Sequence, residues 1–356
     1  MMTESIISIR NLYKIFGKDP AKAMAKVREG MGKDDLLDKT GHVLGLNNIN
    51  LEMKQSEIQV VMGLSGSGKS TLIRHINRLI EPTAGEIIID GEDVLSMNDK
   101  ALKDMRRHKI SMVFQKFALF PHRTVQENAG YGLEIQGESK DVIAERSRRW
   151  IERVGLSGYE DYYPAQLSGG MQQRVGLARA LTTDAEILLM DEAFSALDPL
   201  IRTEMQDILL DLQDELHKTI VFITHDLDEA LRIGDSIAIL RDGEIVQTDD
   251  PQNILMKPAD SYVADFMKDI NRSRVLRIRA IMKPYQDGAE GPELRGSTTL
   301  EQALQTFAEQ SIDRAIVTNR QGARVGYVTI EDVINGMRRP TVEEIHGDEE
   351  VPQGYA

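Results

Sequence analysis

The chain has 356 residues, which is more than one compact core usually holds and suits a large domain with a smaller one. Its formal net charge of −14 argues against a nucleic-acid partner held through phosphate contacts. The absence of cysteine excludes disulfides, thiolate metal sites and thiol catalysis. No apolar run approaches the roughly 18 residues of a membrane helix, and the first residues lack a signal-peptide pattern. We therefore expect a cytoplasmic protein that would meet a membrane only through a partner.

Strand-like apolar runs alternate with helical patterns from about residue 44 to 250, which predicts an α/β domain with a largely parallel sheet. The expected strands are residues 58–62, 109–115, 187–191 and 219–224. One helix is predicted over residues 69–80, and another begins at Pro199 with Asp198 as its N-cap. Residues 237–240 and 244–247 are typical of a hairpin.

Changes in composition and apolar periodicity along the sequence suggest several divisions of the chain. Within a first domain over residues 1–270, residues 17–42 are predicted to be a charged helical insertion and residues 117–180 a helical subdomain. A small α/β unit is expected over residues 275–338. Acidic residues dominate residues 341–356, which predicts a disordered tail.

Residues 63–70 (GLSGSGKS) fit the pattern G-x-x-x-x-G-K-[ST] between a predicted strand and a predicted helix. Glycines let the backbone N–H groups converge on phosphate oxygens, and the helix start adds its positive dipole end. Lys69 is expected to reach the β- and γ-phosphates, and the Ser70 hydroxyl to bind Mg²⁺. A glycine turn with an incidental lysine is disfavoured by the strand and helix on either side. The nucleotide-binding residues predicted here are Gly63, Ser65, Gly66, Ser67, Gly68, Lys69, Ser70 and Thr71.

Further motifs follow the phosphate loop in a fixed order. They are Gln115, residues 167–171 (LSGGM), residues 187–192 (ILLMDE), residues 195–198 (SALD) and residues 224–226 (THD). With this series the sequence resembles the ABC transporter ATPases over roughly its first 260 residues. The resemblance implies a P-loop ATPase fold with a helical subdomain, ATP as substrate and Mg²⁺ as cofactor.

The resemblance also implies roles for four side chains near the phosphate loop. Asp191 ends an apolar strand, where a carboxylate can hold Mg²⁺ or its water. Glu192 is expected to be the general base that polarises the attacking water. Gln115 would contact Mg²⁺ and that water, and His225 would hydrogen-bond the γ-phosphate. The alternatives are a solvent-facing charge, a surface glutamine and a structural histidine.

Four further residues are implied to act across a homodimer interface. Ser168, Gly169 and Gly170 begin a helix whose N-terminal N–H groups suit a γ-phosphate, and the family places this end against the nucleotide of the other subunit. Asp198 would cross the same interface while capping its own helix, and capping alone is the simpler alternative.

An aromatic residue that stacks on adenine is expected near the N-terminus. Tyr13 and Phe16 are the candidates, and the family spacing favours Phe16. The insertion at residues 17–42 departs from the general pattern at this point, and either ring could instead belong to the core.

Three segments closely resemble ATPases of glycine betaine and proline betaine importers. They are the insertion at residues 17–42, residues 117–122 (FALFPH) and residues 192–205. This implies uptake of a quaternary amine or related amino acid such as choline or proline, an integral membrane permease and an extracytoplasmic substrate-binding protein. The chain would then sit at the cytoplasmic face of the cell membrane through the permease.

Residues 326–332 (GYVTIED) resemble the end of a cystathionine-β-synthase-type (CBS) motif. In such motifs Thr329 and Asp332 would meet the phosphate and ribose of an adenine nucleotide. There is room for only one such motif, so a two-motif nucleotide sensor would have to form between subunits. A dimerisation or packing domain without a ligand is an equal alternative.

Other readings of the series are an importer ATPase for histidine or another amino acid, and a non-transport ABC ATPase acting on DNA or ribosomes. The chain has no cysteine hook and holds one ATPase half, which argues against the second. A regulator with an inactive site is disfavoured because Lys69, Asp191, Glu192 and His225 are all present.

Overall fold

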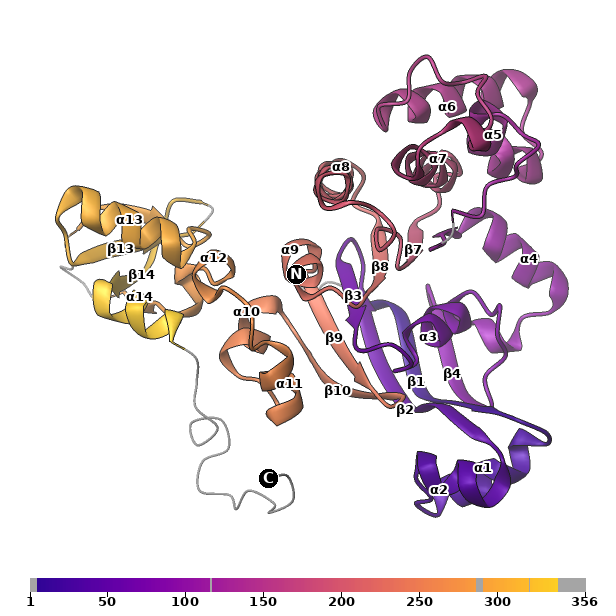
Figure 1. The fold of residues 1–356 in the computed structure, drawn as a ribbon, viewed down its shortest axis with the longest axis horizontal. Coiled ribbons are helices and arrows are strands. Elements are labelled where there is room, and N and C mark those ends of the chain that lie inside the picture. The colour runs from indigo at the N-terminus through magenta and orange to yellow at the C-terminus, as the bar shows by residue number, and fades with distance from the viewer. Residues whose placement is uncertain (1–4, 116, 286–290, 320, 339–356) are drawn as a thin grey trace. The chain divides into compact units, whose positions relative to one another are not determined.

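The computed structural model describes residues 5–115, 117–285, 291–319 and 321–338 (Figure 1). The predicted acidic tail at residues 341–356 lies outside these residues. The chain divides into two units, Met1–Val246 and Gln247–Ala356, and each is described separately. In the described part of the chain, none of the helices combines the length and apolarity that crossing a bilayer requires.

Two sheets form the frame of the first unit. The antiparallel sheet has the order β2-β1-β4-β5. Its strands are β1 (Ser5–Phe16), β2 (Val43–Lys54), β4 (Ala84–Ile89) and β5 (Glu92–Asp93). The other sheet has the order β10-β9-β3-β8-β7-β6, and its strands from β9 to β6 run parallel. These strands are β3 (Ile58–Met62), β6 (Ile110–Val113), β7 (Ile187–Asp191), β8 (Thr219–Thr224), β9 (Ser236–Arg241) and β10 (Glu244–Asp249).

The predicted α/β architecture is confirmed, and the strands expected at residues 58–62, 187–191 and 219–224 have the predicted bounds. Buried side chains from both sheets and from α3 (Lys69–Ile76) form the main core. Leu72, Ile73 and Ile76 supply the contribution of α3, and all three are fully buried. This core fixes the helix that follows the phosphate loop against the parallel sheet.

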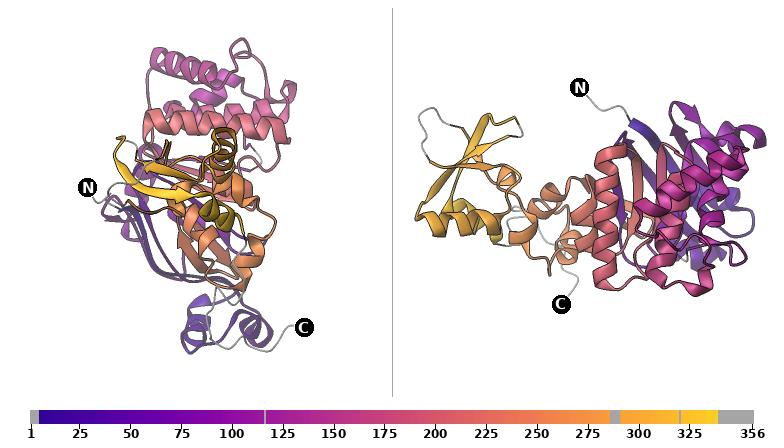
Figure 2. Two further views of the ribbon diagram at one scale, coloured as in Figure 1. Left: turned by 90° about the vertical axis from the view of Figure 1, so that its left-hand side faces the viewer. Right: turned by 90° about the horizontal axis from the view of Figure 1, so that it is seen from above.

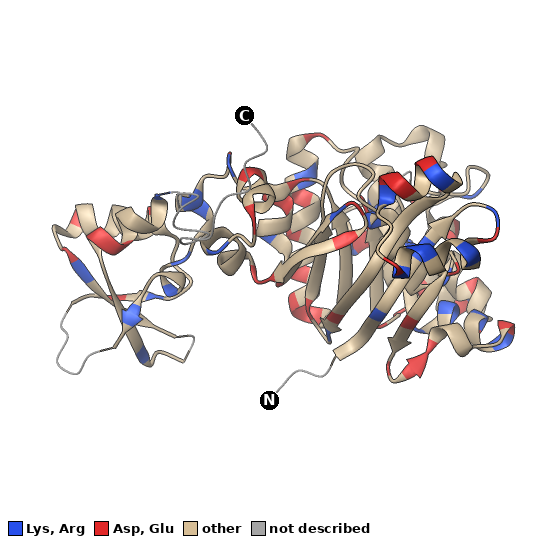
Figure 3. Ribbon diagram, turned by 90° about the horizontal axis from the view of Figure 1, so that it is seen from below, with Lys and Arg blue, Asp and Glu red and all other residues tan. Residues whose placement is uncertain are grey.

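Three helices form a group to one side of the parallel sheet (Figures 1 and 2). They are α5 (Val125–Gln136), α6 (Lys140–Arg153) and α7 (Gly169–Thr182). Outside the insertion, the first unit also has α4 (Asp99–His108), α8 (Pro199–Leu216) and α9 (Leu227–Ile233), with short 3-10 turns at Val94–Ser96 and Pro164–Gln166. Basic and acidic residues are interspersed along these elements (Figure 3).

The insertion between β1 and β2 contains α1 (Pro20–Arg28) and α2 (Lys33–Thr40). It has a small core of its own, in which Met24, Val27 and Leu36 pack with Ile15 of β1 and Leu44 of β2. The amphipathic pattern of each short helix is thus satisfied against the ends of these two strands.

The second unit contains a four-stranded sheet in the order β11-β14-β13-β12. Its strands are β11 (Lys283–Pro284), β12 (Glu293–Arg295), β13 (Arg314–Thr318) and β14 (Arg324–Thr329). Its helices are α10 (Pro251–Met256), α11 (Ser261–Phe266), α12 (Arg272–Val275), α13 (Leu300–Gln310) and α14 (Ile330–Met337), with a 3-10 turn at Ile278–Ala280.

The division between the units falls earlier than the boundary near residue 270 that the sequence suggested. Buried Arg272 explains the difference, because its guanidinium donates hydrogen bonds to the carbonyls of Leu255 and Gly336. Gln252 of α10 adds a bond to the Val275 carbonyl. Helix α10 is therefore tied to the C-terminal helices by buried polar contacts.

Two predicted elements end earlier than the sequence suggested. Helix α3 stops at Ile76 rather than residue 80, since Arg78 adopts the left-handed backbone conformation, and the Leu79 side chain beyond it is exposed. Strand β6 stops at Val113, so Gln115 lies two residues beyond the strand rather than at its end.

Candidate nucleotide-binding and hydrolysis site

The phosphate loop, residues 63–70, leaves the sheet beside two other catalytic candidates. Strand β8 lies between β3 and β7, and all three run parallel. The register pairs Met62 with Thr224 and Asp191 with Ile223. The carboxyl ends of the three strands therefore meet at one edge, where the loop, Glu192 and His225 follow.

Glycines in the phosphate loop meet both steric and conformational demands. Gly63 and Gly68 have φ values of 153° and 107°, which favour glycine. A Cβ at Gly63 would collide with the Leu240 carbonyl, and one at Gly68 would lie 2.8 Å from the Gly45 oxygen. The loop thus passes too close to its neighbours for any side chain at these two positions.

Lys69 is buried at the start of α3, and its ammonium faces the loop itself. The Nζ atom donates hydrogen bonds to the carbonyls of Gly63 at 2.8 Å and Leu64 at 2.9 Å. Burial lowers the pKa of Lys69, and the nearby carboxylates of Glu192 and Asp191 oppose that shift. The buried Ser67 hydroxyl oxygen has no hydrogen-bond partner among the described residues. A phosphate group would supply acceptors for both side chains.

Asp191 and Ser70 present oxygen atoms side by side. The Ser70 hydroxyl donates to Asp191 Oδ1 at 2.7 Å, and Arg74 of the same helix donates to Oδ2 at 3.1 Å. The Asp191 side chain is only 3% exposed. A hydroxyl next to a carboxylate beside the phosphate loop is the donor set that Mg²⁺ takes with a nucleotide, so these residues fit that ion.

Glu192 is the point at which two other predicted side chains converge. Gln115 Nε2 donates to Glu192 Oε2 at 2.9 Å, and His225 Nδ1 lies 3.5 Å from the same oxygen. The Glu192 backbone has φ 46°, and its N–H donates to the Ile223 carbonyl. The left-handed turn directly after β7 aims this carboxylate toward Gln115 and the loop.

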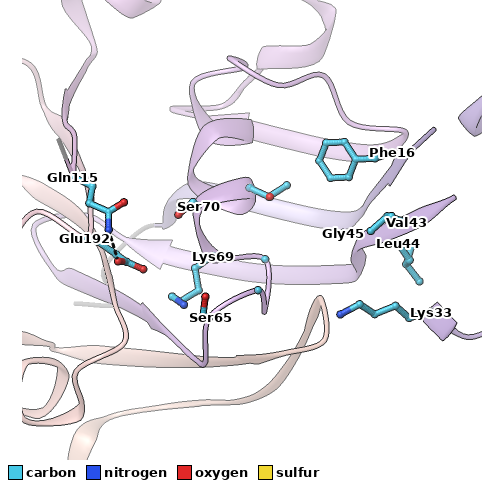
Figure 4. Close-up of a pocket in the computed structure, with 13 residues that line it drawn as sticks. Phe16, Lys33, Val43, Leu44, Gly45, Ser65, Lys69, Ser70, Gln115 and Glu192 are labelled. Carbon is cyan, nitrogen blue, oxygen red and sulfur yellow. Dashed lines mark hydrogen bonds between the residues drawn. The ribbon is translucent and has the colours of Figure 1, made fainter. Parts of the chain in front are cut away.

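A pocket of about 460 Å³ adjoins the phosphate loop (Figure 4). Nine residues predicted from the sequence line it, namely Phe16, Ser65, Gly66, Gly68, Lys69, Ser70, Thr71, Gln115 and Glu192. Gly63, Ser67, Asp191 and His225 are not among its lining residues. Gly63, Asp191 and His225 contact the lining residues Lys69, Ser70 and Glu192, respectively, and Ser67 belongs to the phosphate loop itself.

Phe16 rather than Tyr13 faces this pocket. The Phe16 side chain is exposed, whereas Tyr13 packs against the small core of the insertion. Gly45 makes room for the ring, because a Cβ there would lie 2.6 Å from Phe16 Cε2. The Lys14 ammonium lies 5.0 Å from the ring centroid on the Phe16 side chain. An aromatic face is thus available at the end of the pocket away from Glu192.

The residues expected to act across a dimer lie outside the pocket. Ser168 caps α7, its hydroxyl accepting a bond from the Met171 N–H, and Gly169 and Gly170 form the first turn of that helix. Asp198 caps α8 by accepting bonds from two backbone N–H groups. The predicted capping by Asp198 is confirmed, while its role at an interface stays a prediction.

Several pocket residues were not predicted from the sequence. Val43, Leu44 and Gly45 of β2 line the pocket, and so does Lys33 of the insertion. Arg74, which contacts Asp191, was also missed. The available signal for Arg74 was an arginine five positions after Lys69 on the same predicted helix, and its side chain is 46% exposed.

Comparison with known proteins matches residues 46–195 to the family described as ABC transporter, and residues 292–339 to the CBS domain. The glycine betaine/carnitine transport ATP-binding protein GbuA of Listeria monocytogenes is 51% identical over 332 residues, which cover 92% of this chain and 82% of that protein. The chain belongs to the ABC transporter ATP-binding proteins. It is an ABC ATPase, a class in which ATP hydrolysis powers transport.

Two further relatives of this ABC ATPase are similar over most of its length. The glycine betaine transport ATP-binding protein OpuAA of Bacillus subtilis is 58% identical over 277 residues, 78% of this chain and 66% of that protein. The glycine betaine/proline betaine transport system ATP-binding protein ProV of Escherichia coli is 46% identical over 333 residues, which cover 92% of this chain and 81% of that protein.

A solved structure of an ATP-binding cassette is also similar to this chain. It is the dimeric post-hydrolysis state of the ATP-binding cassette MJ0796 bound to ADP and Pi, which is 32% identical with a TM-score of 0.59. The similarity covers 69% of this chain and 98% of that one. The predicted fold class, an ABC ATPase fold with a C-terminal CBS-like unit, is therefore confirmed.

In the CBS unit, Thr329 and Asp332, the two residues predicted to contact a nucleotide, are hydrogen-bonded to each other. The Thr329 hydroxyl donates to Asp332 Oδ2 at 2.7 Å, and the pair forms a capping box at the start of α14. Lys283 also lies 2.7 Å from Asp332 Oδ1. These contacts give both side chains a structural task that needs no ligand.

Proposed function

We propose that this chain is the ATP-hydrolysing subunit of an importer for a quaternary amine or related compound, such as glycine betaine, proline betaine, choline or proline. It works as a homodimer, drives a separate integral membrane permease from the cytoplasmic face of the membrane, and depends on an extracytoplasmic substrate-binding protein. Three relatives, all of them ATP-binding proteins of glycine betaine transport, support this substrate class.

The observation that carries the hydrolytic part of the proposal is the convergence on Glu192. A carboxylate beside a phosphate loop, contacted by an amide from Gln115 and an imidazole from His225, is equipped to polarise a water. Phe16 at the far end offers a stacking face for adenine. The pocket between them suits one nucleoside triphosphate with its γ-phosphate toward Glu192.

Each part of the site has a separate chemical task. The loop N–H groups and Lys69 bind the phosphates, and Glu192 accepts the proton of the attacking water while Gln115 orients that carboxylate. His225 donates to the γ-phosphate. Mg²⁺, which Ser70, Asp191 and Gln115 would hold, neutralises charge on the phosphate oxygens when it is bound. The strained φ of Glu192 keeps the base in its working direction without help from the substrate.

The second half of each site is proposed to come from the partner subunit. The first turn of α7, with Ser168, Gly169 and Gly170, has free N–H groups suited to a γ-phosphate. A γ-phosphate shared between subunits closes the dimer, and its hydrolysis removes the bridge. This arrangement makes the turnover per subunit rise with protein concentration.

Replacing Glu192 by Gln tests the hydrolytic assignment. The amide keeps the size of the side chain but cannot accept the proton, so we expect turnover to fall about 100-fold or more. ATP binding should persist, and the variant should accumulate as a dimer on size-exclusion chromatography with ATP. Turnover near that of the wild type would contradict the assignment of the base.

A further inference from the structure

Lys33 brings a charged group from the insertion to the nucleotide pocket. It is the first residue of α2, whose buried Leu36 anchors the helix in the small core with Leu44. Lys33 and Leu44 both line the pocket. The helix is thus held by the same strand, β2, that forms one wall of the pocket. The side chain is only 34% exposed.

The Lys33 ammonium is held next to the phosphate loop by the turn between β9 and β10. Its Nζ atom lies 2.9 Å from Asp242 Oδ1. The next residue, Gly243, donates its N–H to the Ser67 carbonyl at 2.9 Å. Figure 4 shows the Lys33 side chain extending from the insertion toward the phosphate loop at Ser65. An ion pair therefore connects α2 to a turn that is bonded directly to the loop.

The position of the Lys33 ammonium along the pocket determines which part of a bound nucleotide it would contact. Phe16 marks the adenine end, and Lys69 and Glu192 mark the end for the β- and γ-phosphates. Figure 4 shows Ser65 beside Lys69, and Lys33 on the side of Val43 and Leu44 with its ammonium directed toward Ser65. The ammonium therefore faces the space between the two ends. In a nucleotide this intermediate part is the ribose with the α-phosphate, whose oxygens are acceptors for an ammonium.

We propose that Lys33 is a nucleotide-binding residue that contacts the ribose and α-phosphate, and that Asp242 holds its ammonium in place between rounds of binding. This rests on the proposed function, since it assigns a further contact within the same ATP site. The α-phosphate and ribose are common to ATP and ADP, so the contact stabilises both nucleotides equally. It supports binding and leaves the hydrolytic step unchanged.

The test measures dissociation constants for Mg-ATP and Mg-ADP on the full-length protein by titration calorimetry. Lys33→Met keeps the length of the side chain without its charge. We expect it to raise both constants by about the same factor, roughly fivefold for a partly exposed charge contact. Its kcat at saturating ATP should match the wild type. Lys33→Arg should restore most of the affinity.

Two variants separate nucleotide binding from a purely structural ion pair. Asp242→Asn breaks the same ion pair but leaves the ammonium, so its nucleotide affinity should equal or exceed that of the wild type. Lys39→Met is the matched control, because Lys39 lies on the same helix and pairs with Asp35. It should change neither constant.

Equal weakening by Asp242→Asn and Lys33→Met would overturn the inference in favour of a structural clamp. Unchanged constants for Lys33→Met would overturn it outright. Wild-type protein that binds no ATP would instead refute the proposed function, so the two failures are distinguishable.

Discussion

Single side chains in this site depend on contacts with residues far away in the sequence. Glu192 receives a hydrogen bond from Gln115, 77 residues earlier, and the buried Asp191 receives one from Arg74. Near His225, the buried Glu229 accepts a bond from Gln206 of α8. A carboxyl group with little access to solvent therefore lies close to the end of β8, which His225 directly follows.

Glu229 gives a prediction at this scale, because burial raises its pKa against the hydrogen bonds from Thr224 and Gln206. The folded protein then binds this proton more tightly than the unfolded chain does. The stability from this group is complete below the unfolded pKa, about 4.3, and is lost as pH rises through the folded pKa. Glu229→Gln lacks this titration, so the variant should gain stability relative to the wild type as pH rises through that window.

Urea unfolding at a series of pH values measures this difference. Asp228→Asn is the control, since its exposed side chain lies next to Glu229 on the same helix. A difference between wild type and Glu229→Gln that stays constant with pH would contradict the argument.

At the scale of elements, the short insertion helices depend on one small core. Helices of eight and nine residues are marginal by themselves, so α1 and α2 need packing to persist. Leu36 is fully buried between Ile15 and Leu44, which belong to the two strands that flank the insertion. The insertion therefore folds onto the wall of the nucleotide pocket.

Leu36→Ala should lower the free energy of unfolding by about 2–4 kcal/mol through lost burial and a residual cavity. Leu37→Ala is the control: the Leu37 side chain is 49% exposed, so a change within about 0.5 kcal/mol is expected. Denaturant unfolding of the two variants measures the contrast. Equal losses would show that the insertion has no defined core.

The sequence predicts the elements and residues whose signals are local. The glycines and lysine of residues 63–70, the apolar run into Asp191 and the Asp198 cap each show in a few adjacent positions. Lys33 could not be found in this way, because its contact with Asp242 spans 209 residues. The preference for Phe16 over Tyr13 likewise depends on a distant contact, because Gly45 on the next strand leaves room for the Phe16 ring. The premature end of α3 follows from the backbone at Arg78, which apolar periodicity did not reveal.

At the scale of the whole molecule, the chain combines an ABC ATPase with a CBS unit, and its described helices include none suited to span a bilayer. In the proposed function, the hydrolytic cycle of this chain is coupled to a separate permease. A coupled ATPase turns over faster when the permease is loaded with the right substrate, because the substrate favours the closed dimer.

The most direct measurement is the ATPase rate of the protein assembled with its permease in liposomes. The substrate-binding protein is added with glycine betaine, choline, proline or histidine in turn. The account predicts that glycine betaine or another quaternary amine raises turnover, and that Glu192→Gln abolishes the response. Basal hydrolysis that none of these compounds stimulates would contradict the quaternary-amine assignment, and stimulation by histidine alone would replace it.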